Sequence, residues 1–250
     1  MIILRSDHEI DRMALAGRLA AECMQEIAPM IRPGVTTAEL DRAAKRFIIG
    51  RGGRPSFLGY RSYPASLCAS VNEEVVHGIP GPRRLRAGDI VGIDLGVILD
   101  GYQGDMARTF PVGAASDEAQ ALIDAARDSF EAALAVMVPG KRLGDIGHAV
   151  QTLAESRGYG VVRELCGHGI GRDMHEDPEV PNYGEAGRGL RLRAGMVLAV
   201  EPMINAGTWK VKFLEDGWTV VTGDGSLSAH WENTVAITAD GPRILTAVDS

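Results

Sequence analysis

The sequence has few of the features that mark membrane, secreted and nucleic-acid-binding proteins. It contains only three cysteines, Cys23, Cys68 and Cys166, and this odd, scattered set does not form a disulfide framework. It has no run of about 18 apolar residues, and the N-terminal Ile2-Ile3-Leu4 is too short for a signal peptide. Basic residues number 26 against 33 acidic ones, so the charge offers nucleic acid no attraction. We therefore expect a cytoplasmic protein that binds neither membrane nor nucleic acid directly.

Several common catalytic motifs are missing too. The sequence has no His-Glu-x-x-His, no Gly-x-Ser-x-Gly and no Gly-x-x-x-x-Gly-Lys phosphate loop. Gly167-x-Gly169 lacks a third glycine at the spacing of a dinucleotide-binding loop. What remains is an ordinary globular composition, with 45% hydrophobic and 24% charged residues in 250.

The order of predicted elements repeats along the chain. Ser6 and Glu9 form a capping box before a helix that runs to Pro29, and Thr36 opens a second helix over 37–49. Strand-like sequence follows over 57–112. A long helix over 116–138, a shorter one over 143–157 and further strands repeat this order.

The two series also share landmarks. Pro33-Gly34 and Pro139-Gly140 break the chain at equivalent points, and Glu39-Leu40 matches Asp145-Ile146 in register. Helix, Pro-Gly and helix also occur together by chance, which is the alternative. We interpret the chain as one catalytic domain, residues 1–250, built from two related halves, 1–113 and 114–250, that share a sheet.

Two aspartates are predicted to lie on one face of a β-hairpin. Asp100-Gly101 is a favoured two-residue turn between strand-like segments. With that turn, Asp94 lies opposite Ala107, and Asp105 becomes its diagonal neighbour at roughly 7–8 Å between Cα atoms. Carboxylates so placed repel each other unless a cation or proton lies between them. By itself such a pair is more often simply solvated.

Two glutamates and three histidines are further candidates. Glu201 ends the apolar run 196–200, where an unpaired carboxylate is costly, although a strand end can also emerge into solvent. Alternation around Glu232 places it on an exposed face. His168 stands between two glycines, which suits a backbone that closely approaches another group. His77 and His175 would ordinarily be structural.

Together these residues resemble the metal centre of the type I methionine aminopeptidases. The resemblance covers nearly the whole chain, from 13–18 onward. It includes the ordered set Asp94, Asp105, His168, Glu201 and Glu232, and the blocks Tyr60-Arg61-Ser62-Tyr63-Pro64, 72–80, 167–171, 201–204 and 216–218. It implies an α+β pita-bread fold with an internal pseudo-twofold and a curved antiparallel sheet covered by helices. The sequence has no zinc-finger extension before 13–18, so the short bacterial form is expected.

The resemblance implies two divalent metal ions, of Co, Mn, Fe or Zn, in this M24 metallopeptidase pattern. Asp94 would chelate one ion, Asp105 and Glu232 would bridge the two, and His168 and Glu201 would complete the coordination of the second ion. A metal-bridging hydroxide would attack the scissile carbonyl, with Glu201 as proton acceptor. His175 would hydrogen-bond the carbonyl oxygen and His77 would contact the scissile amide.

The resemblance also implies the substrate and its pocket. The enzyme would remove the N-terminal methionine of nascent polypeptides when the second residue is small. It would work as a monomer, with the ribosome as an expected partner. A monovalent cation, Na or K, would lie near Asn72, Glu74 and Ser228. Phe57 stands where relatives often have cysteine and Met174 where they have phenylalanine. The methionine pocket would comprise Tyr60, Tyr63, Cys68, Met174 and Trp218, and His77 and His175 would also bind the substrate.

Two other functions fit the same residues. Proline-specific peptidases of this fold use the same five ligands, although the short chain, the 60–63 block and Trp218 favour methionine. A binding protein that has lost its metals is the second alternative, which the complete ligand set disfavours.

Overall fold

The computed structural model describes residues 1–248, and its first two helices begin as the sequence predicts. Helix α1 (Asp7–Ile27) starts at Ser6, whose hydroxyl accepts from the Glu9 amide while the Glu9 carboxylate accepts from the Ser6 amide. Helix α2 (Thr37–Gly50) has the same reciprocal cap from Thr36 and Glu39. A capping box satisfies two amides that the helix leaves unpaired, so both capping-box predictions are confirmed.

The second helix pair differs from the prediction at one end. Helix α3 (Asp117–Leu134) stops four residues before Val138, where the sequence pattern placed its end. Helix α4 (Leu143–Ser156) agrees with the expected range. The prediction for α3 is wrong because Met137 is fully buried outside the helix, so the apolar pattern continues after the helix has ended.

The two halves repeat the same backbone contacts. The Gly34 amide donates to the Leu85 carbonyl at 2.8 Å, and the Gly140 amide donates to the Leu192 carbonyl at 3.0 Å. Both glycines have positive φ, 92° and 95°, a backbone conformation that favours glycine. This correspondence bears out the internal pseudo-twofold. The division at 113/114 and the single domain stay predictions.

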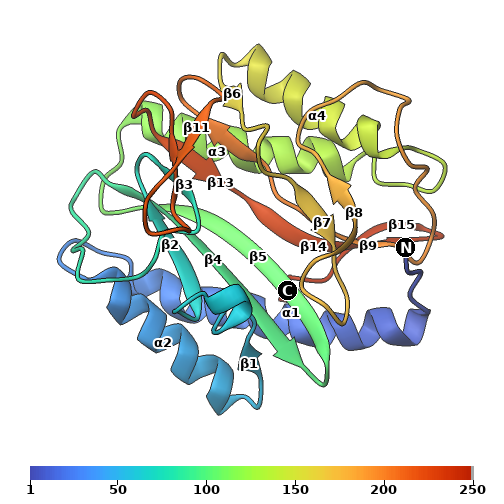
Figure 1. Cartoon of the computed structure of the whole chain (residues 1–250), viewed down its shortest axis with the longest axis horizontal. Coiled ribbons are helices and arrows are strands. Elements are labelled where there is room, and N and C mark those ends of the chain that lie inside the picture. The colour runs from blue at the N-terminus through green and yellow to red at the C-terminus, as the bar shows by residue number, and fades with distance from the viewer. Residues whose placement is uncertain (249–250) are drawn as a thin grey trace.

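A curved antiparallel sheet links the halves (Figure 1). It has nine strands in the order β1-β4-β5-β14-β9-β7-β8, with β2 added on β4 and β15 added on β14. The strands are β1 (Arg54–Pro55), β2 (Leu67–Val71), β4 (Ile90–Leu99), β5 (Tyr102–Pro111), β7 (Gly167–Gly169), β8 (Glu176–Val180), β9 (Val197–Val200), β14 (Glu232–Thr238) and β15 (Gly241–Ile244).

Two smaller three-stranded sheets and two short 3-10 helices complete the chain. One sheet contains β6 (Gly160–Val161), β10 (Met203–Asn205) and β13 (Ser228–His230). The other contains β3 (Glu74–Val76), β11 (Val211–Phe213) and β12 (Val220–Thr222). The 3-10 helices are η1 (Ala28–Met30) and η2 (Tyr60–Ser62).

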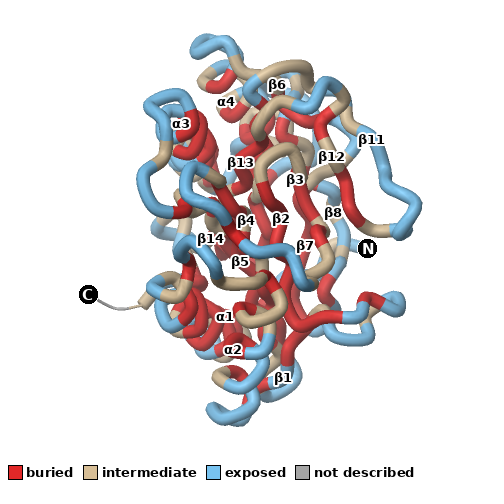
Figure 2. The backbone as a smooth tube through the Cα atoms, turned by 90° about the vertical axis from the view of Figure 1, so that its left-hand side faces the viewer, coloured by how far each residue is buried: buried red, intermediate tan, exposed pale blue. Residues whose placement is uncertain are grey.

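The helices form two pairs that cover the sheet. Helices α1 and α2 pack with β2 and β4 around one apolar core, and α3 and α4 pack with β9 and β14 around another. Figure 2 shows the buried backbone running through the strands between these two helix pairs. Within residues 1–248, no helix combines the length and apolarity needed to cross a bilayer.

Candidate metal centre

The β4–β5 hairpin places the two aspartates as predicted. Asp100 and Gly101 form its two-residue turn, with φ of 50° and 79°, the left-handed backbone that such a turn requires. Asp94 lies opposite Ala107, and Asp105 lies two positions away on the same face. The predicted register is therefore confirmed, and both carboxylates project toward the same region.

The two glutamates reach this region from neighbouring strands. Glu232 begins β14 and pairs with Ala107 of β5, so it stands beside the hairpin. Its exposed fraction is 2%, and the exposed face expected from alternation is wrong because its side chain points toward Asp105 and His168. Glu201 directly follows β9, and its side chain is 14% exposed.

His168 approaches from β7, where the flanking glycines allow close packing. A Cβ on Gly167 would overlap the Ala199 carbonyl oxygen, and one on Gly169 would overlap the Asp177 carbonyl oxygen. The predicted need for close backbone approach is confirmed. The His168 Nδ1–H donates to the Gly169 carbonyl at 2.9 Å, which leaves Nε2 without a proton when the ring is neutral.

The His168 ring is held neutral and faces the carboxylates. Burial lowers its pKa to about 4. Its Nε2 lies 3.7 Å from Glu201 Oε1 and 3.9 Å from Asp105 Oδ2. A lone pair at this position beside carboxylate oxygens is the donor set that a divalent transition metal prefers.

Further observations fit a metal centre. One ligand atom from each of Asp105, His168 and Glu232 lies within 4.8 Å of the others. The buried Oδ1 atoms of Asp94 and Asp105 have no hydrogen-bond partner within residues 1–248. Buried carboxylate oxygens without donors are costly, and coordinated cations would satisfy them.

Electrostatics lead to the same conclusion. Burial raises the pKa of all four carboxyls, and that of Asp105 reaches about 7. Neighbouring carboxylates raise the pKa values of Asp94, Glu201 and Glu232 further. Four such groups stay ionised at neutral pH only if positive charge lies among them.

A cavity of about 130 Å³ opens onto this cluster. The acidic residues and His168 form one part of its wall, and aromatic and histidine side chains form the rest. The lining residues are Phe57, Tyr60, Arg61, Tyr63, Cys68, His77, Asp94, Asp105, His168, His175, Glu201, Trp218 and Glu232. The cavity therefore combines an apolar compartment with a charged one.

The aromatic compartment contains four of the five side chains predicted for the methionine pocket. Tyr63 meets Trp218 edge-on at 5.0 Å between centroids and Phe57 edge-on at 6.4 Å. Met174 is buried with its methyl group near Gly96, and it is not among the side chains that line the cavity. Its place in the methionine pocket stays a prediction, and Phe57 also forms part of the wall.

His77 and His175 also line the cavity. The Tyr60 hydroxyl lies 2.7 Å from His175 Nδ1, and the His175 ring packs 4.2 Å from that of His168. His77 meets Trp218 edge-on at 6.1 Å. Burial lowers the pKa of His77 to about 4 and also lowers that of His175, so both rings are neutral near pH 7.

Arg61 and His230 are residues near the centre that sequence reasoning missed. Arg61 lines the cavity. His230 Nε2 is buried without a hydrogen-bond partner in the described chain and lies 3.8 Å from Glu201 Oε2. Its position two residues before Glu232 was the available signal, since alternate residues of a strand share a face.

Similarity to known proteins agrees with this geometry. The sequence pattern of metallopeptidase family M24 matches residues 11–239. A methionine aminopeptidase from Clostridium acetobutylicum is 55% identical over 98% of this chain and 99% of its own. The crystal structure of methionine aminopeptidase from Rickettsia prowazekii is 44% identical, with a TM-score of 0.98 over 99% of this chain and all (100%) of that one.

A more distant likeness concerns the fold alone. The prolidase from Pyrococcus furiosus superposes with a TM-score of 0.81 at 22% identity, over 99% of this chain and 66% of its own. The pita-bread fold is thus confirmed. The chain belongs to metallopeptidase family M24 and, within it, to the bacterial type I methionine aminopeptidases.

Proposed function

We propose that this metal-dependent hydrolase removes the N-terminal methionine from nascent polypeptides whose second residue is small. One observation carries the proposal. An aromatic compartment adjoins a cluster of buried carboxylates and a neutral histidine in a single cavity. The apolar part suits a thioether side chain, and the charged part lies where the first peptide bond of a bound chain would be.

Five residues would hold two divalent ions: Asp94, Asp105, His168, Glu201 and Glu232. Their carboxylate and imidazole donors suit Co, Mn, Fe or Zn. The partnerless oxygens of Asp94 and Asp105 support such binding. When bound, paired metal ions lower the pKa of water toward 7 and polarise a carbonyl group.

Glu201 would accept the proton of the attacking water. Its carboxylate lines the cavity beside Asp94 and Asp105, where a water bound among these side chains would be within its reach. Its oxygens face His168 on one side and His230 on the other. The side chain is thus held at the edge of the cavity.

His175 would stabilise the carbonyl oxygen as negative charge develops on it. If the Tyr60 hydroxyl donates to Nδ1, the proton of the neutral ring resides on Nε2, which is free to donate. A preorganised donor aimed at developing charge stabilises the transition state.

His77 would contact the scissile amide and limit the second residue. It stands at the cavity wall beside Trp218 with a positive φ of 60°. Its neutral ring offers one donor and one acceptor to an amide. Tyr60, Tyr63, Cys68 and Trp218 would receive the methionine side chain.

We further propose a Na or K site near Asn72, Glu74 and Ser228. The support is that the Asn72 carbonyl accepts from the Ser228 amide at 2.9 Å, which brings two of these residues together. We also propose that the enzyme is cytoplasmic and monomeric and that it meets its substrates at the ribosome.

The test is cleavage of Met-Ala-Ser after complete metal removal and reconstitution with Mn, Fe, Co, Zn or Mg in turn. We expect no activity without metal, recovery with at least one transition metal, and two equivalents bound per chain. A purified protein that binds no metal would instead support a binding protein on this fold. Faster cleavage of Ala-Pro-Ser would support a proline-specific peptidase.

A further inference from the structure

The loop that carries His175 is organised by the side chain of the residue after it. Glu176 begins β8, and its carboxylate turns back toward residues 172–173. Its Oε1 accepts from the Arg172 amide at 3.0 Å and from the Asp173 amide at 3.2 Å. This one carboxylate therefore closes the loop 171–175 at the point where the chain leaves His175.

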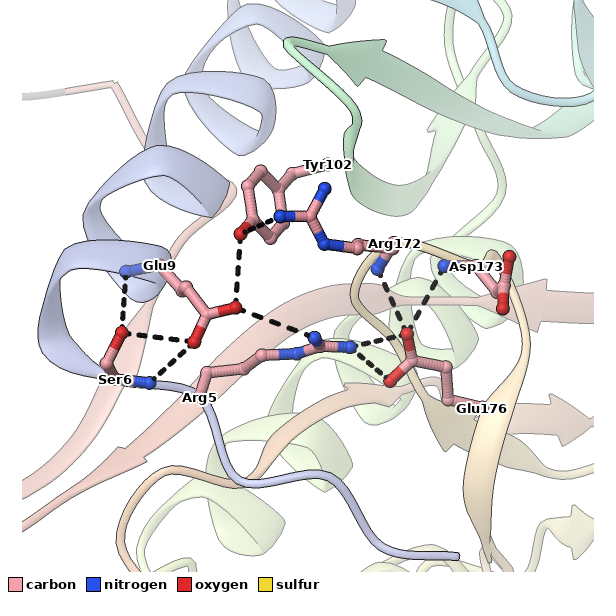
Figure 3. A network of polar contacts seen from close by, with 7 residues as sticks. All are labelled: Arg5, Ser6, Glu9, Tyr102, Arg172, Asp173 and Glu176. Atoms are coloured by element: carbon pink, nitrogen blue, oxygen red, sulfur yellow. Dashed lines mark hydrogen bonds and ion pairs between the residues drawn. The ribbon is translucent and has the colours of Figure 1, made fainter.

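A guanidinium from the start of the chain holds this carboxylate in turn. Arg5 Nη2 donates to both Glu176 oxygens at 2.5 Å, as Figure 3 shows. The two side chains are only 5% and 9% exposed, so water screens the pair weakly. Arg5 is itself fixed, because its amide donates to the Gly195 carbonyl at 2.7 Å and Ser6 caps α1.

The loop fits closely around the guanidinium. A Cβ on Gly171 would overlap Arg5 Nη2, so only glycine leaves room for the arginine there. A second connection runs in parallel, where Arg172 Nη2 donates to the Tyr102 hydroxyl at 2.8 Å. That hydroxyl donates to Glu9 at 3.1 Å (Figure 3).

We propose that Arg5 is a positioning residue for His175 and acts through Glu176. This rests on the proposed role of His175 in the reaction. Arg5 does not line the cavity, and its effect reaches the imidazole through the backbone that joins Glu176 to His175. The N-terminal segment thereby sets the position of a donor that must meet the substrate oxygen within a few tenths of an ångström.

Arg5→Met and Arg5→Lys test this in two backgrounds, the unchanged chain and His175→Ala. We expect Arg5→Met to lower kcat for Met-Ala-Ser by about 10- to 100-fold, the size of a misplacement of about 1 Å, with KM changed much less. Arg5→Lys should lose less, because its ammonium keeps the charge but cannot reproduce the guanidinium fork. In the His175→Ala background, Arg5→Met should have almost no further effect, because residues that act as a unit are non-additive.

Arg243→Met is the matched control. Arg243 also anchors α1, through Asp11 at 2.7 Å, but this pair is 48% and 65% exposed and far in sequence from the loop. We expect its kcat to stay within about twofold of the unchanged protein, as befits an exposed ion pair. Metal content and thermal unfolding are measured for every variant, and all should bind the same metal.

The outcomes separate the two claims. Full kcat in Arg5→Met, or an equal loss with and without His175, would overturn the positioning role. If Arg5→Met does not fold, Arg5→Lys and Glu176→Gln enter the same cycle with His175→Ala, and additivity there would overturn it. Failure of the unchanged enzyme to cleave Met-Ala-Ser would refute the proposed function instead.

Discussion

Replacing His175 by alanine separates catalysis from metal binding. The imidazole lines the cavity and its Nδ1 lies 2.7 Å from the Tyr60 hydroxyl; if that hydroxyl donates to Nδ1, the other ring nitrogen carries the proton and is free to donate. Losing one donor to a developing oxyanion typically costs about 10²–10³ in kcat, or about 2.7–4 kcal/mol. We expect a loss of this size in His175→Ala, with two metal equivalents still bound.

Tyr60→Phe is a milder variant that changes the hydrogen-bond partner of the same histidine. It keeps the ring stack on His175, 5.3 Å between centroids, and removes only the hydroxyl. A net hydrogen bond is worth about 0.5–1.5 kcal/mol, so we expect a loss of kcat of about 2- to 10-fold. Steady-state kinetics on Met-Ala-Ser with parallel metal analysis provides the assay. Loss of metal from His175→Ala would refute the reasoning, because the histidine would then be a ligand.

Two further predictions concern charge. Asp105→Asn and Glu232→Gln should each abolish nearly all activity and lower the metal content, because an amide keeps the shape of the side chain but not the charge that holds the ions. The circular dichroism spectrum should stay unchanged. Full activity in either variant would contradict the bridging role. Because burial lowers the pKa of His77 to about 4, the folded state binds fewer protons than the unfolded state between that value and about 6.5. Its contribution to stability is therefore lost as pH falls through this window. We expect the free energy of unfolding of His77→Gln, measured with denaturant at pH 7 and pH 5, to fall less between these two pH values than that of the unchanged protein. An equal fall would contradict the assigned pKa shift.

Local signals in the sequence predicted the parts of the site that local rules govern. The Asp100-Gly101 turn determined the hairpin register, and from it the common face of Asp94 and Asp105. The glycines around His168 indicated close backbone approach, which the Ala199 carbonyl explains. In each case the signal lies in the residues next to the side chain concerned.

The misplaced residues depend on contacts distant in sequence. Glu232 is buried because its side chain lies against Asp105 of β5 and His168 of β7, and alternation within β14 does not report those neighbours. Met137 continued the apolar pattern of α3 after the helix had ended, because it is buried in the core shared with α4. Family resemblance supplied the role of Glu232 that periodicity could not.

The central claim is that one cavity selects methionine at the first position and a small residue at the second. The direct measurement is kcat/KM for Met-Ala-Ser, Met-Leu-Ser, Leu-Ala-Ser and Ala-Pro-Ser at one metal concentration. We predict fast cleavage of Met-Ala-Ser, as of Met-Gly and Met-Ser peptides, and slow cleavage of Met-Leu and Met-Lys peptides. Leu-Ala-Ser should be slower by about 10- to 200-fold, the usual discrimination of an apolar pocket for a methylene-sized difference, and norleucine should be accepted well. Equal rates for Met-Ala-Ser and Met-Leu-Ser, or faster cleavage of Ala-Pro-Ser, would contradict it.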